Sequence, residues 1–298
     1  MMEPKLKNYL HLHFIVFIWG FTAVLGKLIT IDALPLVWYR MLLATLCVLG
    51  FIFYRRYNLK VSRKMLFSLI FTGVIIALHW VTFFGAIKAS NVSVALATMS
   101  TGAFFTALIE PFWYKRKMLA YEIVFGLVVI FGLYIIFKVD AQYVKGIILA
   151  LISALLSAIF SLMNGKLIQK ERPSVISFYE LLSGAVFLTL YLVFKGDINQ
   201  ELLKISSTDL LYIFILASVC TAYAFIASVK LLKYISPYTV MLTVNLEPVY
   251  GIILAFFIFG NSEKMGPLFY LGGAIIISTV IANGIVKNRR RIKKATIE

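Results

Sequence analysis

Ten long apolar runs dominate this sequence and limit what the chain can fold into. Along the chain they cover roughly 9–30, 34–54, 65–87, 91–113, 119–138, 146–167, 174–194, 208–230, 237–259 and 266–287. Each is about 20 residues or slightly longer, which as a helix matches the ~30 Å hydrocarbon core of a bilayer. Lipid offers no partner for backbone polar groups, and continuous apolar runs lack the alternation of barrel strands. The runs therefore predict an all-α membrane protein with ten transmembrane helices.

The composition excludes several other classes of protein. Of the 298 residues, 61% are hydrophobic and only 14% are charged, whereas soluble domains carry roughly 25% charged residues. The net charge of +16 is spread over short clusters between the apolar runs, which is typical of cytoplasmic loops rather than of a nucleic-acid-binding surface. Cys47 and Cys220 both lie inside apolar runs and form no metal-binding spacing. We therefore expect no nucleic-acid partner, no metal and no cofactor.

The distribution of Lys and Arg predicts the topology. If both termini are cytoplasmic, the segments on that side hold 21 Lys and Arg, and the opposite segments hold seven. This bias follows the positive-inside rule and supports an even number of spans. The basic tail at 287–294 is expected to contact anionic lipid on the cytoplasmic side. Lys27 and Lys166, near the ends of their runs, are expected to extend toward the membrane interface.

Short matches between the two halves of the chain indicate an internal repeat. The sequence Gly-Lys-Leu-Ile at 26–29 recurs at 165–168, and further matches follow at an offset of about 139 to 146 residues. Among them, Thr98 and Ser100 align with Thr243 and Asn245. Each half holds five spans, and because five is odd the halves must insert in opposite directions. We therefore predict two inverted five-helix repeats, residues 1–144 and 145–298.

A carboxyl group near the middle of the run 237–259 is the strongest candidate for a functional group. Glu247 would lie near the membrane midplane, where a charge is costly and usually functional. Desolvation favours its neutral form unless a cation is close, so it could carry a proton or neutralise a cationic group of a substrate. The alternative is a carboxyl group that only packs between helices. The adjacent Pro248 lacks a backbone donor and frees a carbonyl about one turn earlier.

Other polar and aromatic side chains share this depth and are candidate substrate contacts. They are Trp19, His79, Trp80, Thr98, Ser100, Tyr223, Thr243 and Asn245. His79 can change charge near neutral pH, and the aromatic rings lie away from the interfacial belts. Each has a packing alternative, because hydroxyl and amide groups commonly join membrane helices. Arg40 and Glu180 are repeat mates near opposite membrane surfaces, and they could act as gates or extend to the interface.

These residues resemble a known family. The resemblance rests on Trp19-Gly20, on Pro35 and Arg40, on the small residues at 89–95 and on Glu247-Pro248. With the ten-run layout, they make the chain similar to the EamA-like ten-helix transporters of the drug/metabolite transporter superfamily. The chain departs from that pattern twice. Gly102-Ala103 stand where the family often has a proline, and the basic segment 115–118 stands where it often has a glutamate.

The resemblance implies secondary active transport of a small organic metabolite across the bacterial inner membrane by alternating access. An amino acid or derivative, moved in the export direction, is the expected substrate. An uncoupled facilitator or exchanger of a nucleotide-derived metabolite such as S-adenosylmethionine is the alternative. Protons are the candidate coupling ion, carried by Glu247 or His79. No nucleophile motif or phosphate loop is present, so no enzymatic activity is expected. The substrate, the direction and the choice between monomer and homodimer stay open.

Overall fold

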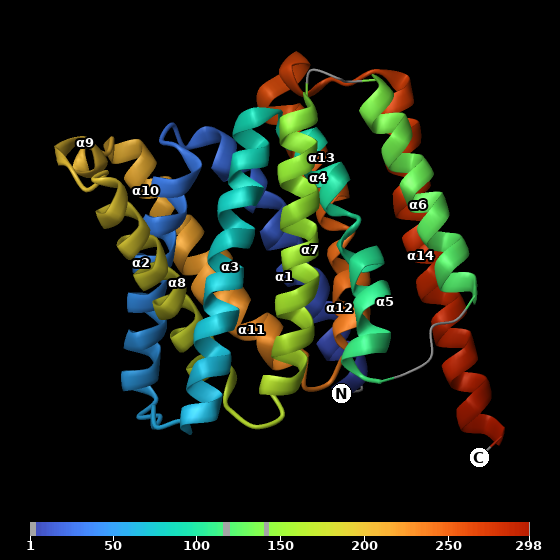
Figure 1. Cartoon of the computed structure of the whole chain (residues 1–298), viewed down its shortest axis with the longest axis horizontal. Helices are drawn as coiled ribbons and strands as arrows, with labels where there is room; N and C mark the ends of the chain where they lie inside the picture. The colour runs from blue at the N-terminus through green and yellow to red at the C-terminus, as the bar shows by residue number, and fades with distance from the viewer. Residues whose placement is uncertain (1–3, 116–119, 140–142, 298) are drawn as a thin grey trace.

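The computed structural model describes residues 4–115, 120–139 and 143–297, and the regular structure in these ranges is helical. Positions 116–118 of the basic segment and the side chains of the basic tail lie outside the described residues. In chain order the helical elements are α1 (Pro4–Leu28), α2 (Ala33–Tyr54), α3 (Arg63–Ala89), α4 (Val92–Met99), α5 (Gly102–Trp113), α6 (Ala120–Val139), α7 (Val144–Leu167), α8 (Pro173–Lys195), α9 (Gln200–Leu203), α10 (Ser207–Ala217), the π-helical η2 (Ser218–Tyr223), α11 (Ala224–Leu231), α12 (Pro237–Val244), α13 (Glu247–Phe259), the 3₁₀ turn η3 (Gly260–Glu263) and α14 (Pro267–Ile297) (Figure 1).

Eight helical spans in the described part are long and apolar enough to cross a membrane. They are α1, α2, α3, α4 with α5, α7, α8, α10 with η2 and α11, and α12 with α13 and η3. The two other predicted spans form α6 and α14, whose apolar stretches in the described part are shorter, at Val124–Ile136 and Pro267–Asn283. The chain is therefore a multi-pass helical membrane protein, and the count of ten spans stays a prediction.

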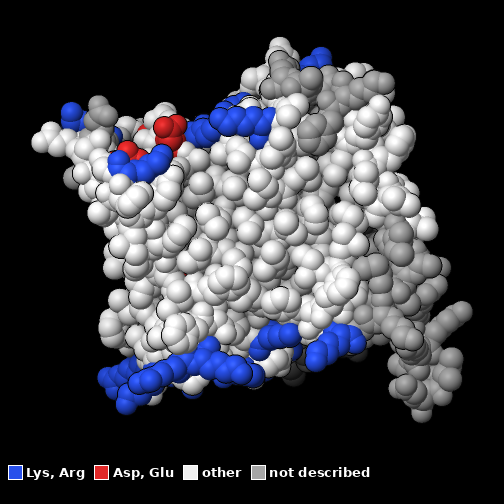
Figure 2. Space-filling view, in the orientation of Figure 1, with Lys and Arg blue, Asp and Glu red and all other residues white. Residues whose placement is uncertain are grey.

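The helices stand side by side in an upright bundle, and α6 and α14 pair along one flank (Figure 1). The end that holds the N-terminus and the turns after α2, α5, α7 and α11 is called here the lower end. The turns after α1, α3, α8 and α13 form the upper end. On the face seen in Figure 2, Lys and Arg form a band along the lower edge, whereas the upper edge carries both signs of charge. On this face, the two ends of the bundle therefore differ in charge.

Two spans are broken near their middle, at positions that match in the two halves of the chain. The α4–α5 break falls at Ser100–Thr101, and the α12–α13 break falls at Asn245–Leu246. The second break directly precedes Pro248, which sits in the first turn of α13, where its missing N–H is not needed. The first break has no proline. Its side-chain hydroxyls instead bond back to carbonyls three residues earlier, so they compete with helix hydrogen bonding (Ser100 Oγ to Ala97 O, 2.6 Å; Thr101 Oγ1 to Thr98 O, 2.8 Å).

Close backbone contacts at glycines fix α3 against α8. A Cβ atom on Gly73 would lie 2.3 Å from the carbonyl oxygen of Glu180, and one on Gly184 would lie 2.8 Å from the carbonyl oxygen of Gly73. Only hydrogen fits at either position, so the two backbones pack directly on each other. Small residues serve this purpose widely in membrane helices. The contact holds Glu180 at the interface between the two helices.

Candidate functional site

A cavity of about 90 Å³ lies inside the bundle between α1, α2, α3, the end of α4, α7, η2 with α11, and α12 with α13. This volume has room for several water molecules. Its lining reaches the lower end of the bundle at Leu232, directly after α11. Toward the upper end it stops at Thr22 and Phe83, each six residues before its helix ends. The cavity therefore belongs to the middle and the lower half of the bundle.

Arg40 supplies a buried cation at the cavity wall. Its side chain is 2% exposed, and its guanidinium carbon lies 3.9 Å from the centroid of the Trp80 ring. Nε donates to Thr221 Oγ1 at 2.7 Å, and Nη1 has no hydrogen-bond partner among the described residues. The group is thus held in place by stacking and one hydrogen bond, with a donor still free.

The π-helical segment η2 positions the groups that bind Arg40 and Trp19. Thr221 Oγ1 donates to the carbonyl of Leu216, five residues earlier, at 2.7 Å, and accepts from Arg40. The carbonyl of Cys220 accepts from Trp19 Nε1 at 3.2 Å. A wider helical turn displaces backbone carbonyls from their usual partners, and such turns are frequent at functional sites. Here it ties α1 and α2 to the same segment.

Glu247 supplies an acid on the same cavity. It is the first residue of α13, at the break in the ninth predicted span, and its side chain lines the cavity. No described residue forms a hydrogen bond or an ion pair with its carboxyl group. The cavity therefore presents an arginine and a glutamate that are not paired with each other.

His79 lies on the cavity wall and is tied to α7. Its Nδ1 lies 2.9 Å from the carbonyl oxygen and 2.8 Å from the hydroxyl of Ser153, and that hydroxyl also donates to the carbonyl of His79 at 2.9 Å. The ring packs between Phe83 and Phe160, with centroids 6.3 and 5.3 Å away. In the described part of the chain, no group of three or more His, Cys, Asp or Glu could hold a metal ion.

A polar stripe on α7 completes the wall, and our sequence analysis missed it. Ser157, Ser161 and Asn164 all line the cavity, and Ser153 precedes them by one turn. Their spacing of four, four and three residues places them on one helix face, so this periodicity in an apolar run was the available signal. Ser228, Phe225 and Thr22 also line the cavity and had no comparable signal.

Glu180 lies behind this wall. Asn164 Nδ2 donates to its Oε2 at 3.3 Å, and the side chain has no exposed surface. Arg40 is also buried. Neither Arg40 nor Glu180 therefore extends to the membrane interface, which was the alternative to a gating role. Lys27, expected to extend to the interface, instead forms an ion pair with Glu263.

The remaining predicted residues lie outside the cavity lining. Thr98 is buried, Ser100 bonds to its own helix, and Thr243 Oγ1 donates to the carbonyl of Thr239 at 3.0 Å. Asn245 is buried at the end of α12, next to the start of α13 at Glu247-Pro248. Tyr223 is 45% exposed, and its hydroxyl lies 3.0 Å from His11 Nε2. The structure thus brings Trp19, Arg40, His79, Trp80 and Glu247 together on one cavity, and the others do not line it.

Comparison with known proteins places this architecture among transporters. The EamA-like transporter family matches residues 7–138 and again residues 144–284. An uncharacterized transporter of Archaeoglobus fulgidus is 25% identical over 286 residues, which is 92% of this chain and 96% of the relative. Another from the same organism is 27% identical over 150 residues, 50% of this chain and 52% of the relative. A solved crystal structure with 14% identity shares the fold at a TM-score of 0.68, covering 93% of this chain and 96% of its own.

Proposed function

Because the chain belongs to the EamA-like transporter family, we propose that it is a secondary transporter of a small zwitterionic metabolite, an amino acid or a close derivative. The observation that carries this proposal is that Arg40 and Glu247 line one cavity without a direct ion pair between them. The relatives add only that proteins of this kind are transporters.

The chemistry of the cavity fits a zwitterion. The free Nη1 of Arg40 is a charge-assisted donor for a carboxylate, and the carboxyl group of Glu247 is an acceptor for an ammonium group. Trp19, Trp80 and Phe160 provide apolar surface for the remainder of the molecule. Ser157, Ser161 and Asn164 add neutral hydrogen-bonding groups. A substrate with both charges would bind two groups, the buried Arg40 and the partly buried Glu247, that make no direct ion pair in the described structure.

Alternating access is the proposed mechanism, with the lower end facing the cytoplasm of a bacterial inner membrane. The basic lower edge supports this orientation through the positive-inside rule. The two family matches and the two matching helix breaks support inverted halves. With this orientation, the cavity reaches the cytoplasmic end and is closed toward the other, as expected for a transporter that receives its substrate from the cell and exports it.

Proton coupling is part of the proposal, and Glu247 is the residue that carries the proton. Glu247 borders the cavity without a partner, so a proton and a substrate ammonium group would compete for the same carboxyl group. His79 is the second candidate, since the Ser153 contacts engage its Nδ1 and leave Nε2 as the ring nitrogen that would take a proton. Arg40, Glu180 and Pro248 stay proposed as residues that couple movements of the helices. Arg40 binds Thr221 in the other half, the backbone of Glu180 packs on Gly73 in the other half, and Pro248 borders a helix break.

The experiment uses purified protein in proteoliposomes with an imposed pH gradient and radiolabelled amino acids. We expect at least one amino acid with an apolar side chain to accumulate against its gradient, and the accumulation to collapse with a protonophore. Exchange of a nucleotide-derived metabolite without accumulation would favour the uncoupled alternative, for which the aromatic cavity wall is the supporting observation. Absence of saturable transport and of binding for both classes would overturn the proposal.

A further inference from the structure

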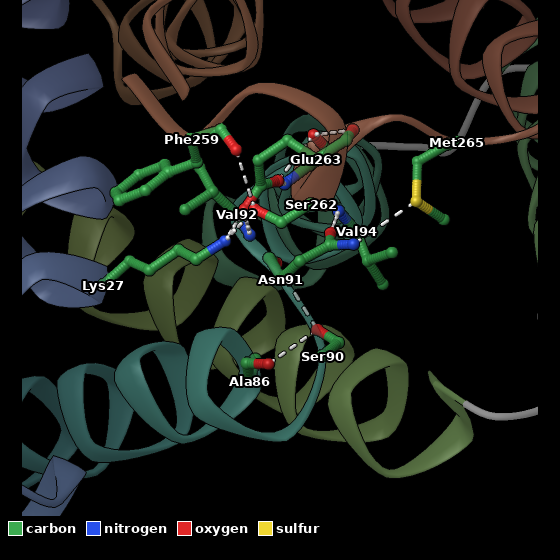
Figure 3. A network of polar contacts seen from close by, with 11 residues as sticks. Lys27, Ala86, Ser90, Asn91, Val92, Val94, Phe259, Ser262, Glu263 and Met265 are labelled. Atoms are coloured by element: carbon green, nitrogen blue, oxygen red, sulfur yellow. Dashed lines mark hydrogen bonds and ion pairs between the residues drawn. The ribbon is translucent and has the colours of Figure 1, made fainter. Parts of the chain in front are cut away.

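A buried carboxylate joins three helix ends at the upper end of the bundle (Figure 3). Glu263, in η3 directly after α13, forms an ion pair with Lys27 at the end of α1, at 2.6 Å. The same carboxylate accepts the backbone N–H of Val92 at 3.2 Å, the N–H of Ser93 at 2.8 Å and the hydroxyl of Ser93 at 2.8 Å, all at the start of α4. Glu263 thus holds α1, α4 and α13 together with one side chain.

The geometry accounts for why this network is strong. The first N–H groups of a helix have no partner within the helix and carry partial positive charge. Glu263 accepts two of them in α4, and the side chain of Asn91 accepts the next, from Val94 at 2.8 Å. Lys27 adds a full positive charge, a hydrogen bond to Ser262 Oγ at 3.1 Å and a position 4.4 Å from the Phe259 ring centroid. Separating α1 from α4 and α13 would leave buried polar groups unpaired.

The lysine at the corresponding place of the lower end has different contacts. Lys166, the repeat mate of Lys27, sits near the end of α7 and donates to the carbonyl of Trp113 at 3.1 Å. Its Nζ lies 4.7 and 5.4 Å from the ring centroids of Trp113 and Tyr114, at the end of α5. By the repeat offset, Glu263 corresponds to the basic segment 115–117. Lys166 therefore contacts a carbonyl and two rings at the place where Lys27 contacts a carboxylate.

We propose that Glu263 is a positioning residue for transport: it closes the upper mouth of the cavity by binding Lys27 and the start of α4. Because Lys27 binds a carboxylate whereas Lys166 binds a carbonyl and two rings, the resting protein is biased toward the state that is open below. The inference rests on the proposed alternating access, and it adds the residue that sets which side is open when no substrate is bound.

The experiment measures access to the cavity and requires no substrate. The reporter is a Thr22→Cys variant in the full chain with Cys47→Ser and Cys220→Ala, because Thr22 is the cavity residue of α1 nearest to the network. A membrane-impermeant maleimide is applied to inside-out and to right-side-out vesicles. We expect the reporter thiol to be labelled from the lower side in the parent. With Glu263→Gln or Lys27→Gln, labelling from the upper side should become about tenfold faster or more.

Lys264→Gln is the matched control, since Lys264 is the exposed neighbour of Glu263 and lies outside the network. It should label like the parent. If Glu263→Gln does not fold, Lys27→Gln decides alone, because it keeps the carboxylate on α4. Unchanged upper-side labelling in a folded variant, or a parent already labelled from the upper side, would overturn the inference. If the labelling changes as expected but the protein transports no substrate, the gating role of Glu263 is supported and the proposed function is overturned.

Discussion

The guanidinium carbon of Arg40 lies 3.9 Å from the centroid of the Trp80 ring, which places a positive charge flat against an aromatic face inside the bundle. Arg40 comes from α2 and Trp80 from α3, and the hydrogen bond to Thr221 ties both to η2 in the second half of the chain. A buried cation without a carboxylate partner needs such support, because desolvation is expensive. Stacking and the hydroxyl contact supply part of it, and Nη1 still lacks a partner among the described residues.

Arg40→Lys should weaken substrate binding although it keeps the charge. Lysine has no planar group to lie on Trp80, and it cannot bond Thr221 and a carboxylate with a fixed fork. Losing one charge-assisted hydrogen bond costs about 1.5–3 kcal/mol, so we expect an affinity loss of about tenfold to a hundredfold. Calorimetric titration of the purified protein measures it. Arg172→Lys, at an exposed position, is the control. Equal affinities for parent and variant would contradict the role of Arg40.

Glu247→Gln should remove both the ammonium contact and the coupling to protons. The amide keeps the shape of the side chain but carries no charge and cannot release a proton. We expect accumulation driven by a pH gradient to disappear. Binding of a carboxylate-only analogue should fall by less than binding of the zwitterion. Glu171→Gln, which changes an acid in the turn after α7, should leave both measurements unchanged. A fully active and equally pH-dependent Glu247→Gln protein would end this part of the proposal.

His79→Gln should keep proton-driven accumulation, because the coupled proton is assigned to Glu247, while the Nδ1 contacts of His79 with Ser153 hold α3 against α7. Glutamine can still form a hydrogen bond with Ser153, but it loses the packing of the ring against Phe83 and Phe160. We expect a stability loss of about 1–2 kcal/mol and a lower melting temperature, with the same pH dependence of transport. If the variant binds substrate but loses its response to pH, His79 rather than Glu247 carries the proton.

Gly73→Ala should destabilise the helix bundle, and Gly50→Ala should not. A Cβ on Gly73 would meet the carbonyl oxygen of Glu180 at 2.3 Å, whereas one on Gly50 would meet nothing within 4 Å. Overpacking of this kind costs about 1–3 kcal/mol, while alanine in a helix is favoured over glycine by up to about 1 kcal/mol. Thermal unfolding of the detergent-purified variants compares the two. Similar melting temperatures would show that α3 and α8 can separate at little cost.

The depth of a residue could be predicted from the sequence, but the direction of its side chain only in part. Glu247 was predicted at mid-depth from its place in the run 237–259, and it borders a mid-depth cavity. Tyr223 was placed at a similar depth, yet its side chain is 45% exposed and contacts His11. Tyr223 ends the π-helical η2, and an added residue in a turn rotates every following side chain relative to a regular α-helix. No spacing rule based on 3.6 residues per turn anticipates this rotation.

The internal repeat matched the positions of the two helix breaks but did not predict which side chains line the cavity. It aligned Thr98 and Ser100 with Thr243 and Asn245, and both helix breaks fall at or beside these residues. Their side chains nevertheless lie outside the cavity lining, and two of them bond to carbonyls of their own helices. The stripe from Ser153 to Asn164 on α7, by contrast, could have been found from its spacing.

The sequence by itself determined that this chain is built of helices of membrane-spanning length, because backbone hydrogen bonds in lipid must be made within each segment. Only the tertiary structure decided that Arg40 lies on Trp80 and that Glu263 binds the start of α4, some 170 residues earlier in the chain. The physical reason is that lipid and neighbouring helices are equally apolar. The hydrophobic pattern therefore does not mark which face of a helix packs against which partner.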